Sequence, residues 1–295
     1  MSLQTINIGR FYTGGEVGSH PTILIGTLFV EDIGLLYDTG TFRIEAGKVQ
    51  ENIEINTRNC RKIGMPVIIN LFTKTEEAFS KQIEFVIAKT DFPFLISGSK
   101  QSTRLAGLEI VTNLRALDRA VYQSISVDSS DNELQWLANN QPSAIMVKLG
   151  NLKNHTVDDA LKKVDQIKAR LPLNLHSRLL LWIDFVDEVS IKRFCEMGQH
   201  LRKMTGHPIV GSPFTGIHSW QKLKIKGQAE YVSALASTIG FCTAFGFDFL
   251  FIGPLRHLTN LSTAQGVVDI YNRYNLIDKN SEDFLSENHP IHELL

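Results

Sequence analysis

The sequence alternates eight times between a short apolar run and a longer segment with helical spacing of its apolar residues. Strands are expected at 22–29, 67–72, 94–97, 120–124, 143–149, 179–185, 208–211 and 247–252. Helices are expected between and after them, at 45–63, 76–88, 102–114, 132–139, 157–170, 189–205, 229–244 and 264–274. The strands are apolar on both faces, which is typical of a parallel sheet covered by helices. Eight repeats in 295 residues favour a closed (β/α)8 TIM barrel over an open doubly wound sheet.

Composition excludes several classes of protein. The 30 Lys and Arg residues nearly balance the 31 Asp and Glu residues, so no electrostatic feature points to nucleic acid or an anionic membrane. No apolar run is long enough to span a bilayer, and the first residues show no signal-peptide pattern, so we expect a cytoplasmic protein. Cys60, Cys195 and Cys242 have no metal-binding or disulfide spacing and are expected to be buried and reduced.

The ends of the chain carry weaker signals. Residues 5–11 are expected to form a short strand or a cap over one end of the fold. A polar tail begins at about Asp278. No linker rich in proline or serine divides the chain, so a single domain over residues 1–295 is expected.

In a barrel of this type, function lies at the carboxyl ends of the strands. The candidate binding residues there are Asn70, Ser97, Gln123, Ser126, Lys148, Asn151, Asp184, Gly211 and Ser212. Most of them are neutral amides and hydroxyls, with no cluster of His, Cys and Glu, so no catalytic metal is expected. Neutral amide and hydroxyl side chains suit a flat, uncharged heterocycle that both donates and accepts hydrogen bonds. Taken singly, Ser, Gly and Asn at such positions are also common turn residues.

Two charged residues at these strand ends allow sharper hypotheses. Asp184 follows the apolar run LLLWI, where a carboxylate needs a partner or a ligand, and it could accept two N–H bonds from an aminopyrimidine edge. Lys148 ends another apolar strand and either extends into water or forms a Schiff base with a carbonyl substrate. Arg104 and Arg119 are expected to form structural ion pairs.

Four segments resemble the H-subunit family of tetrahydromethanopterin S-methyltransferase, which includes corrinoid-dependent methyltransferases that use tetrahydrofolate. These segments are PTILIGTLF, DFPFLISGS with the following TRLAG, LDRAVYQSIS and GFDFLFIGP. The resemblance implies a pterin-binding barrel that moves a methyl group between a corrinoid cobalt and N5 of a reduced pterin. It also implies a separate corrinoid-binding protein that docks over the barrel, and a homodimer.

The chain departs from the family pattern at several strand ends. Ser97 stands where the family usually has Asp, Gln123 where it has Asn, and Asn70 where Asp is frequent, whereas Asp184 matches. The run GSPFTG after the seventh strand lacks the Asn that related enzymes place near N5. Few acidic residues stand at the carboxyl ends of the strands, which favours methylation of tetrahydrofolate by a methylated corrinoid protein. Asp184 and Gln123 are the candidate catalytic residues. The alternatives are a non-catalytic paralogue that binds pterin or a corrinoid protein, and a Schiff-base lyase using Lys148.

Overall fold

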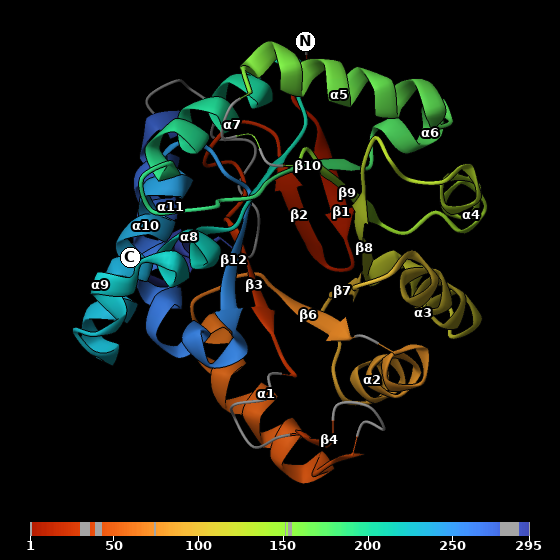
Figure 1. Cartoon of the computed structure of the whole chain (residues 1–295). Helices are drawn as coiled ribbons and strands as arrows, with labels where there is room; N and C mark the ends of the chain where they lie inside the picture. The colour runs from red at the N-terminus through yellow and green to blue at the C-terminus, as the bar shows by residue number, and fades with distance from the viewer. Residues whose placement is uncertain are drawn as a thin grey trace.

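The computed structural model describes residues 2–29, 36–38, 43–73, 75–150, 152, 155–277 and 289–294. Eight parallel strands close into a barrel in the order β10-β11-β12-β3-β6-β7-β8-β9 (Figure 1). Their bounds are β3 (Ile23–Thr27), β6 (Val67–Thr73), β7 (Phe94–Gly98), β8 (Ala120–Ile125), β9 (Ala144–Lys148), β10 (Leu179–Ile183), β11 (Ile209–Gly211) and β12 (Phe249–Pro254). The barrel closes where β12 pairs with β3, Phe249 lying opposite Ile23. The predicted (β/α)8 barrel is therefore confirmed.

The strands are nearly continuous apolar runs because both of their faces are covered. In β10, Leu181 and Ile183 are fully buried, while Trp182 between them is only partly buried. The Trp182 ring lies 5.6 Å, centroid to centroid, from the ring of Phe251 on β12. Two bulky rings from these strands thus pack together, so this part of the barrel is filled by side chains.

A ring of helices surrounds the strands (Figure 1). The eight helices expected from the sequence are α1 (Ala46–Lys62), α2 (Glu76–Lys89), α3 (Gln101–Asn113), α4 (Asp131–Asn140), α5 (Val157–Arg170), α7 (Ile191–Thr205), α10 (Gln228–Ala244) and α11 (Leu258–Ile277). Local signals set several helix ends. Thr156 and Asp159 form a capping box before α5, and Gly64, which directly follows the helix expected at 45–63, adopts φ +67° after α1. Helix α11 begins six residues earlier than expected because the 3-10 turn η3 (Leu255–His257) continues directly into it.

Several short elements were not predicted. They are β4 (Leu36–Asp38), β5 (Arg43–Ile44), η2 (Leu117–Arg119), α6 (Leu173–His176), α8 (Pro213–Ser219), α9 (Gln221–Lys224) and α12 (Ile291–Leu294). No helix was expected between the strand at 208–211 and the helix at 229–244, but Pro213 occupies the first turn of α8, where its missing N–H costs nothing. Residues 38–42, whose polar composition predicts a loop, lie mostly outside the described residues, as does most of the polar tail.

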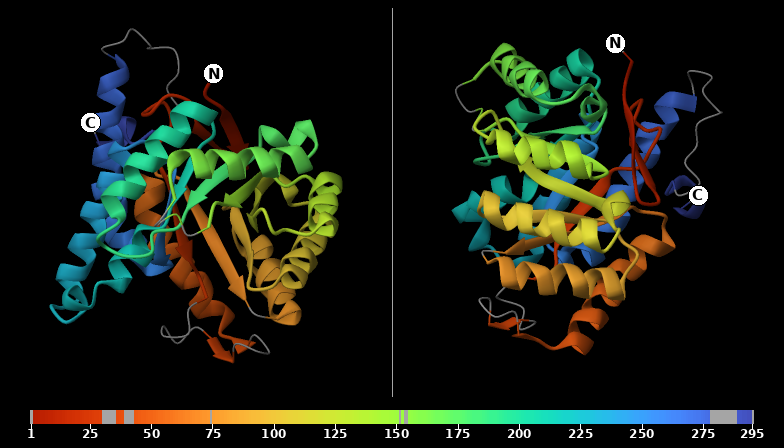
Figure 2. Two further views of the ribbon diagram at one scale, coloured as in Figure 1. Left: turned by 45° about the horizontal axis from the view of Figure 1, so that its top comes forward. Right: turned by 90° about the vertical axis from the view of Figure 1, so that its right-hand side faces the viewer.

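The N-terminal segment forms a hairpin of β1 (Thr5–Ile8) and β2 (Phe11–Gly14), which turns through Gly9 at φ +59°. The hairpin lies across one end of the barrel (Figure 2). This is the end where the strands begin, because Gln4 and Gly9 bond to backbone groups that precede β11 and β8. The hairpin therefore leaves the carboxyl ends of the strands uncovered, and the expectation of a strand or cap at 5–11 is confirmed.

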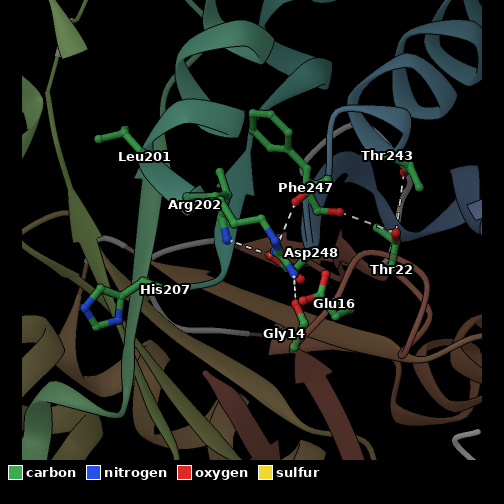
Figure 3. A network of polar contacts seen from close by, with 12 residues as sticks. Gly14, Glu16, Thr22, Leu201, Arg202, His207, Thr243, Phe247 and Asp248 are labelled. Carbon is green, nitrogen blue, oxygen red and sulfur yellow. Dashed lines mark hydrogen bonds and ion pairs between the residues drawn. The ribbon is translucent and has the colours of Figure 1, made fainter. Parts of the chain in front are cut away.

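A buried ion pair ties the hairpin to the barrel. Arg202 of α7 pairs with Asp248, just before β12, and donates to the carbonyl oxygens of Gly15 at 2.5 Å and Gly246 at 3.1 Å (Figure 3). Asp248 also accepts from the backbone N–H of Ile209 at 2.8 Å. Burial raises the pKa of Asp248, and the Arg202 charge opposes that shift. This ion pair stabilises the end of the barrel where the strands begin, and it lies away from the candidate site.

Two further expectations concern the whole chain. Cys60, Cys195 and Cys242 are buried and free, as predicted. Within the described ranges, no helix combines the length and the apolar character that a membrane span requires.

Candidate functional site

The candidate site lies at the carboxyl ends of β6 to β10, and we call it the barrel mouth; it comprises Asn70, Ser97, Gln123, Lys148 and Asp184. The strand register brings two of these residues directly together, because Ser97 of β7 pairs with Gln123 of β8. Asn70 of β6 lies opposite Thr27 of β3 and donates from Nδ2 to Thr27 Oγ1 at 2.9 Å. Parallel register thus gathers side chains that are far apart in sequence.

Two amide oxygens at the barrel mouth lack hydrogen-bond partners. Asn70 Oδ1 and Gln123 Oε1 are both buried, and neither accepts a hydrogen bond within the described part of the chain. Native structures leave few buried polar atoms unsatisfied, and each such atom calls for an explanation. Two unsatisfied acceptors at the functional end of a barrel suit a ligand that presents N–H groups.

Lys148 and Asp184 at the barrel mouth form an ion pair. Lys148 Nζ lies 3.4 Å from Asp184 Oδ2, with the two side chains 40% and 25% exposed. The same ammonium lies 4.7 Å from the centroid of the Trp182 ring. An ion pair this exposed contributes at most about 1 kcal/mol, so a ligand can take over either partner at little cost. Asp184 thus has the partner that its position required, and it remains accessible.

The other predicted site residues make contacts within the protein. Ser126 Oγ accepts from the backbone N–H of Asp128 at 3.2 Å, and Ser212 Oγ accepts from Trp182 Nε1 at 2.8 Å. A Cβ on Gly211 would lie 2.7 Å from the Phe247 ring, so the absence of a side chain there permits close packing. Asn151 lies outside the described residues. The structure thus brings Asn70, Ser97 and Gln123 together and gives Ser126, Gly211 and Ser212 local structural contacts.

A buried network supports the strands that carry Ser97 and Gln123. Glu133 of α4 accepts from Tyr122 Oη at 2.6 Å and from Arg104 Nη2 at 2.6 Å, and Arg104 Nη1 also donates to the Gly98 carbonyl oxygen at 3.3 Å. Burial, with the Glu133 charge second, raises the pKa of Tyr122, which keeps its hydroxyl protonated. The structural ion pair predicted for Arg104 is therefore confirmed, and it fixes the ends of β7 and β8.

Arg119 is held differently. Its guanidinium donates to the carbonyl oxygens of Thr90 at 2.5 Å and Ile87 at 3.2 Å and lies 5.6 Å from the centroid of the Phe94 ring. Backbone carbonyls and an aromatic face therefore provide its close contacts, where the sequence suggested an ion pair.

A cavity of about 500 Å³ opens beside the barrel mouth, and we call it the side cavity. It lies between the ends of β3 and β12 and the segments α8, α9, α10 and η3. Its lining includes Thr27, Phe214, His218, Lys224, Tyr231, Gly253, Arg256 and His257. None of these was among the binding residues predicted from the sequence, because no helix was expected between residues 211 and 229, a segment that supplies much of this lining. The signal left unused was the aromatic and basic content of the segment 214–231, which holds Phe214, Trp220, Tyr231 and three lysines.

Chemically, the barrel mouth offers hydrogen bonds with little net charge. One lysine and one carboxylate compensate each other, and amides and a hydroxyl complete the set. Among the residues that the structure describes, no group of three His, Cys, Asp or Glu side chains is arranged to hold a metal ion. The site therefore suits recognition and alignment of a neutral heterocycle.

The fold and the site together define a TIM barrel with polar side chains of almost no net charge at its mouth. A family model described as Tetrahydromethanopterin S-methyltransferase MtrH subunit matches residues 3–282. Because this match covers almost the whole chain, the protein belongs to that family. The family resemblance inferred from the four sequence segments is confirmed.

Curated relatives carry consistent names. The H subunit of tetrahydromethanopterin S-methyltransferase from Methanothermobacter marburgensis is 32% identical over 153 residues, which are 52% of this chain and 49% of that one. In that match the chain spans about half the length of its curated relative. The corresponding H subunit from Methanosarcina acetivorans is 24% identical over 309 residues, covering 99% and 97% of the two chains. The H subunit of the putative methyltransferase mtx from Methanosarcina barkeri is 22% identical over 280 residues, with 90% of each chain covered. All three are named as methyltransferases, which is the enzyme class that the sequence predicted.

Solved structures confirm the barrel type. Dihydropteroate synthase from Stenotrophomonas maltophilia superposes with a TM-score of 0.61 at 11% identity, over 91% of this chain and 98% of that one. A truncated 3-deoxy-D-arabino-heptulosonate 7-phosphate synthase from Thermotoga maritima gives 0.56 at 12% identity, over 94% and 93%. At these identities the likeness establishes the fold alone.

Proposed function

We propose that this protein is a methyltransferase that moves a methyl group from a methylated corrinoid protein to N5 of tetrahydrofolate. Family membership supports the reaction class. The observation that supports a pterin as the substrate class is the pair of buried, unsatisfied acceptors, Asn70 Oδ1 and Gln123 Oε1, at the barrel mouth. A reduced pterin ring presents several N–H groups at its edges, and these two oxygens can accept them.

The remaining residues of the barrel mouth have roles in the same binding mode. Asp184 accepts two N–H bonds from the aminopyrimidine edge, a bidentate arrangement that carboxylates favour. Lys148 stays beside Asp184 and compensates its charge. Ser97, paired in register with Gln123, offers a hydroxyl to the same face of the ring.

The proposed direction of transfer is supported by the scarcity of acids at the barrel mouth. In the proposed direction the lone pair of neutral N5 attacks the methyl carbon, the cobalt–carbon bond breaks, and its electron pair remains on cobalt as cobalt(I). N5 then loses its proton to water. The reverse reaction expels an amide-like nitrogen and requires an acid or a strong hydrogen bond at N5. Amides and a hydroxyl at Asn70, Gln123 and Ser97 suit the first direction, in which the protein supplies mainly proximity and alignment.

The contacts of Lys148 argue against the Schiff-base alternative. Its charged ammonium is paired with Asp184 and lies over the Trp182 ring. A Schiff base requires the neutral amine as nucleophile, and both contacts engage the ammonium.

The test is an anaerobic reaction of the full chain with methylcobalamin and tetrahydrofolate. Cobalt(I) absorbance and 5-methyltetrahydrofolate should appear together in equal amounts. The variant Lys148→Ala should raise KM for tetrahydrofolate and still turn over, and borohydride should trap no adduct with carbonyl compounds. A parallel reaction with tetrahydromethanopterin compares the two pterins directly.

Three outcomes would contradict the proposal. Pterin binding without any methyl transfer would favour a non-catalytic paralogue. Faster transfer to tetrahydromethanopterin than to tetrahydrofolate would overturn the choice of pterin. Complete loss of activity in Lys148→Ala, with borohydride trapping in the unmodified protein, would favour the lyase.

A further inference from the structure

The side cavity has an aromatic wall built from α8, α10 and η3. The rings of Phe214 and His218 stack with centroids 5.2 Å apart and an interplanar angle of 19°. The ring of His257 lies 6.0 Å from Phe214, and that of Tyr231 lies 6.2 Å from His257. Such a wall offers flat faces on which another aromatic ring can stack.

Gly253 lets this wall lie directly on the end of β12. It has φ +76°, and a Cβ there would lie 2.3 Å from atoms of the Phe214 ring. Both the backbone conformation and the contact with Phe214 therefore require glycine. The aromatic wall therefore packs directly against the end of β12 through Phe214.

The charged side chains that line the cavity are basic. Lys224 of α9 and Arg256 of η3 line it, and no acidic side chain does so among the described residues. The Tyr231 hydroxyl is buried and makes no hydrogen bond within the described ranges, although the residue lines the cavity. Burial raises the pKa of Tyr231 to about 12, so the hydroxyl remains a donor at neutral pH. Two cationic side chains and a hydroxyl donor in the lining favour an anionic ligand.

The side cavity and the barrel mouth share a wall. Thr27 lines the cavity, and its Oγ1 accepts the hydrogen bond from Asn70 Nδ2 at 2.9 Å. Thr27 therefore lies between the barrel mouth and the side cavity, so the two sites are adjacent. The cavity volume of about 500 Å³ is within the range that binds small organic molecules.

We propose that the side cavity binds the aryl carboxylate tail of tetrahydrofolate, with the benzoyl ring on the Phe214–His218 wall and the carboxylates at Lys224 and Arg256. This assignment rests on the proposed function for the identity of the substrate. A free anion such as inorganic phosphate offers related chemistry at Lys224 and Arg256, but it leaves the aromatic wall unused. The aromatic wall is therefore the reason for choosing an aryl carboxylate.

The test is calorimetry on the full chain with four ligands: tetrahydrofolate, p-aminobenzoylglutamate, 6-methyltetrahydropterin, which has no tail, and inorganic phosphate. The variant Lys224→Ala removes one cation from the cavity. Lys222→Ala, on the same short helix but exposed and outside the lining, is the matched control. Lys224→Ala should weaken tetrahydrofolate and p-aminobenzoylglutamate about tenfold and leave 6-methyltetrahydropterin unchanged, since a charged hydrogen bond is worth about 1.5 kcal/mol or more. Lys222→Ala should change none of the four.

The outcomes separate this inference from the proposed function. Unchanged tetrahydrofolate affinity in Lys224→Ala, or an equal loss for 6-methyltetrahydropterin, would overturn the tail assignment. Phosphate binding more tightly than p-aminobenzoylglutamate would overturn it as well. If 6-methyltetrahydropterin does not bind while p-aminobenzoylglutamate binds in a Lys224-dependent manner, the aryl carboxylate site stands and the proposed pterin site fails.

Discussion

Asp184 ends an otherwise apolar strand, and its carboxylate lies 3.4 Å from Lys148 Nζ with a quarter of its side chain exposed. The sequence predicted that this acid needs a partner or a ligand, and the structure shows a partner that a ligand can replace. The predicted barrel placed these two strands side by side, but the sequence did not give the residue register, in which Lys148 lies opposite Trp182 and so next to Asp184.

Asp184→Asn tests the role of this carboxylate. We expect kcat/KM for tetrahydrofolate to fall about 100-fold, because hydrogen bonds to a charged group are worth about 1.5–3 kcal/mol and the amide can accept only on one side. Steady-state kinetics measure the change. The matched control is Asp187→Asn, whose carboxylate accepts from Ser190 at 2.6 Å and serves the turn before α7. Equal losses of activity in the two variants would show that Asp184 has no special role in binding.

At the level of elements, β7, β8, α3 and α4 form the part of the barrel that carries Ser97 and Gln123. The sequence predicted these strands and helices to within about two residues, because apolar runs and helical spacing are strong signals there. It did not predict α8 and α9, whose seven and four residues are too few to show a helical period. The side cavity was missed for the same reason, since those two helices form one of its sides.

Glu133→Gln tests the network that fixes these elements. The Glu133 side chain is 1% exposed and that of Arg104 is 15% exposed, so the change leaves a nearly buried cation without its counter-charge. We expect the free energy of unfolding to fall by about 3 kcal/mol, as is typical when one partner of a buried ion pair is removed. Urea denaturation measures it.

The control for this prediction is Asp131→Asn on the same helix. Its ion pair with Arg170 is exposed, the Asp131 side chain being 94% accessible, so we expect a loss below about 1 kcal/mol. If both variants unfold at the same urea concentration, the buried network does not stabilise β7 and β8 as described.

At the scale of the whole molecule, the N-terminal hairpin covers the end of the barrel where the strands begin, and the candidate site lies at the opposite end. The hairpin and the Arg202–Asp248 pair occupy the covered end, while the barrel mouth and the side cavity share the opposite one. The sequence predicted the barrel, because eight repeats fix the topology, and it placed the candidate site at the carboxyl ends of the strands. Which polar atoms remain unsatisfied could not be predicted, since that depends on the packing around Asn70 and Gln123.

The central claim is that the barrel mouth binds a reduced pterin, and a crystal structure of the protein with tetrahydrofolate tests it most directly. We predict that the pterin ring lies at the carboxyl ends of β6 to β10. Its N–H groups should reach Asn70 Oδ1, Gln123 Oε1 and the carboxylate of Asp184. A pterin ring bound elsewhere on the protein, with those three groups still lacking ligand contacts at saturating tetrahydrofolate, would contradict the account.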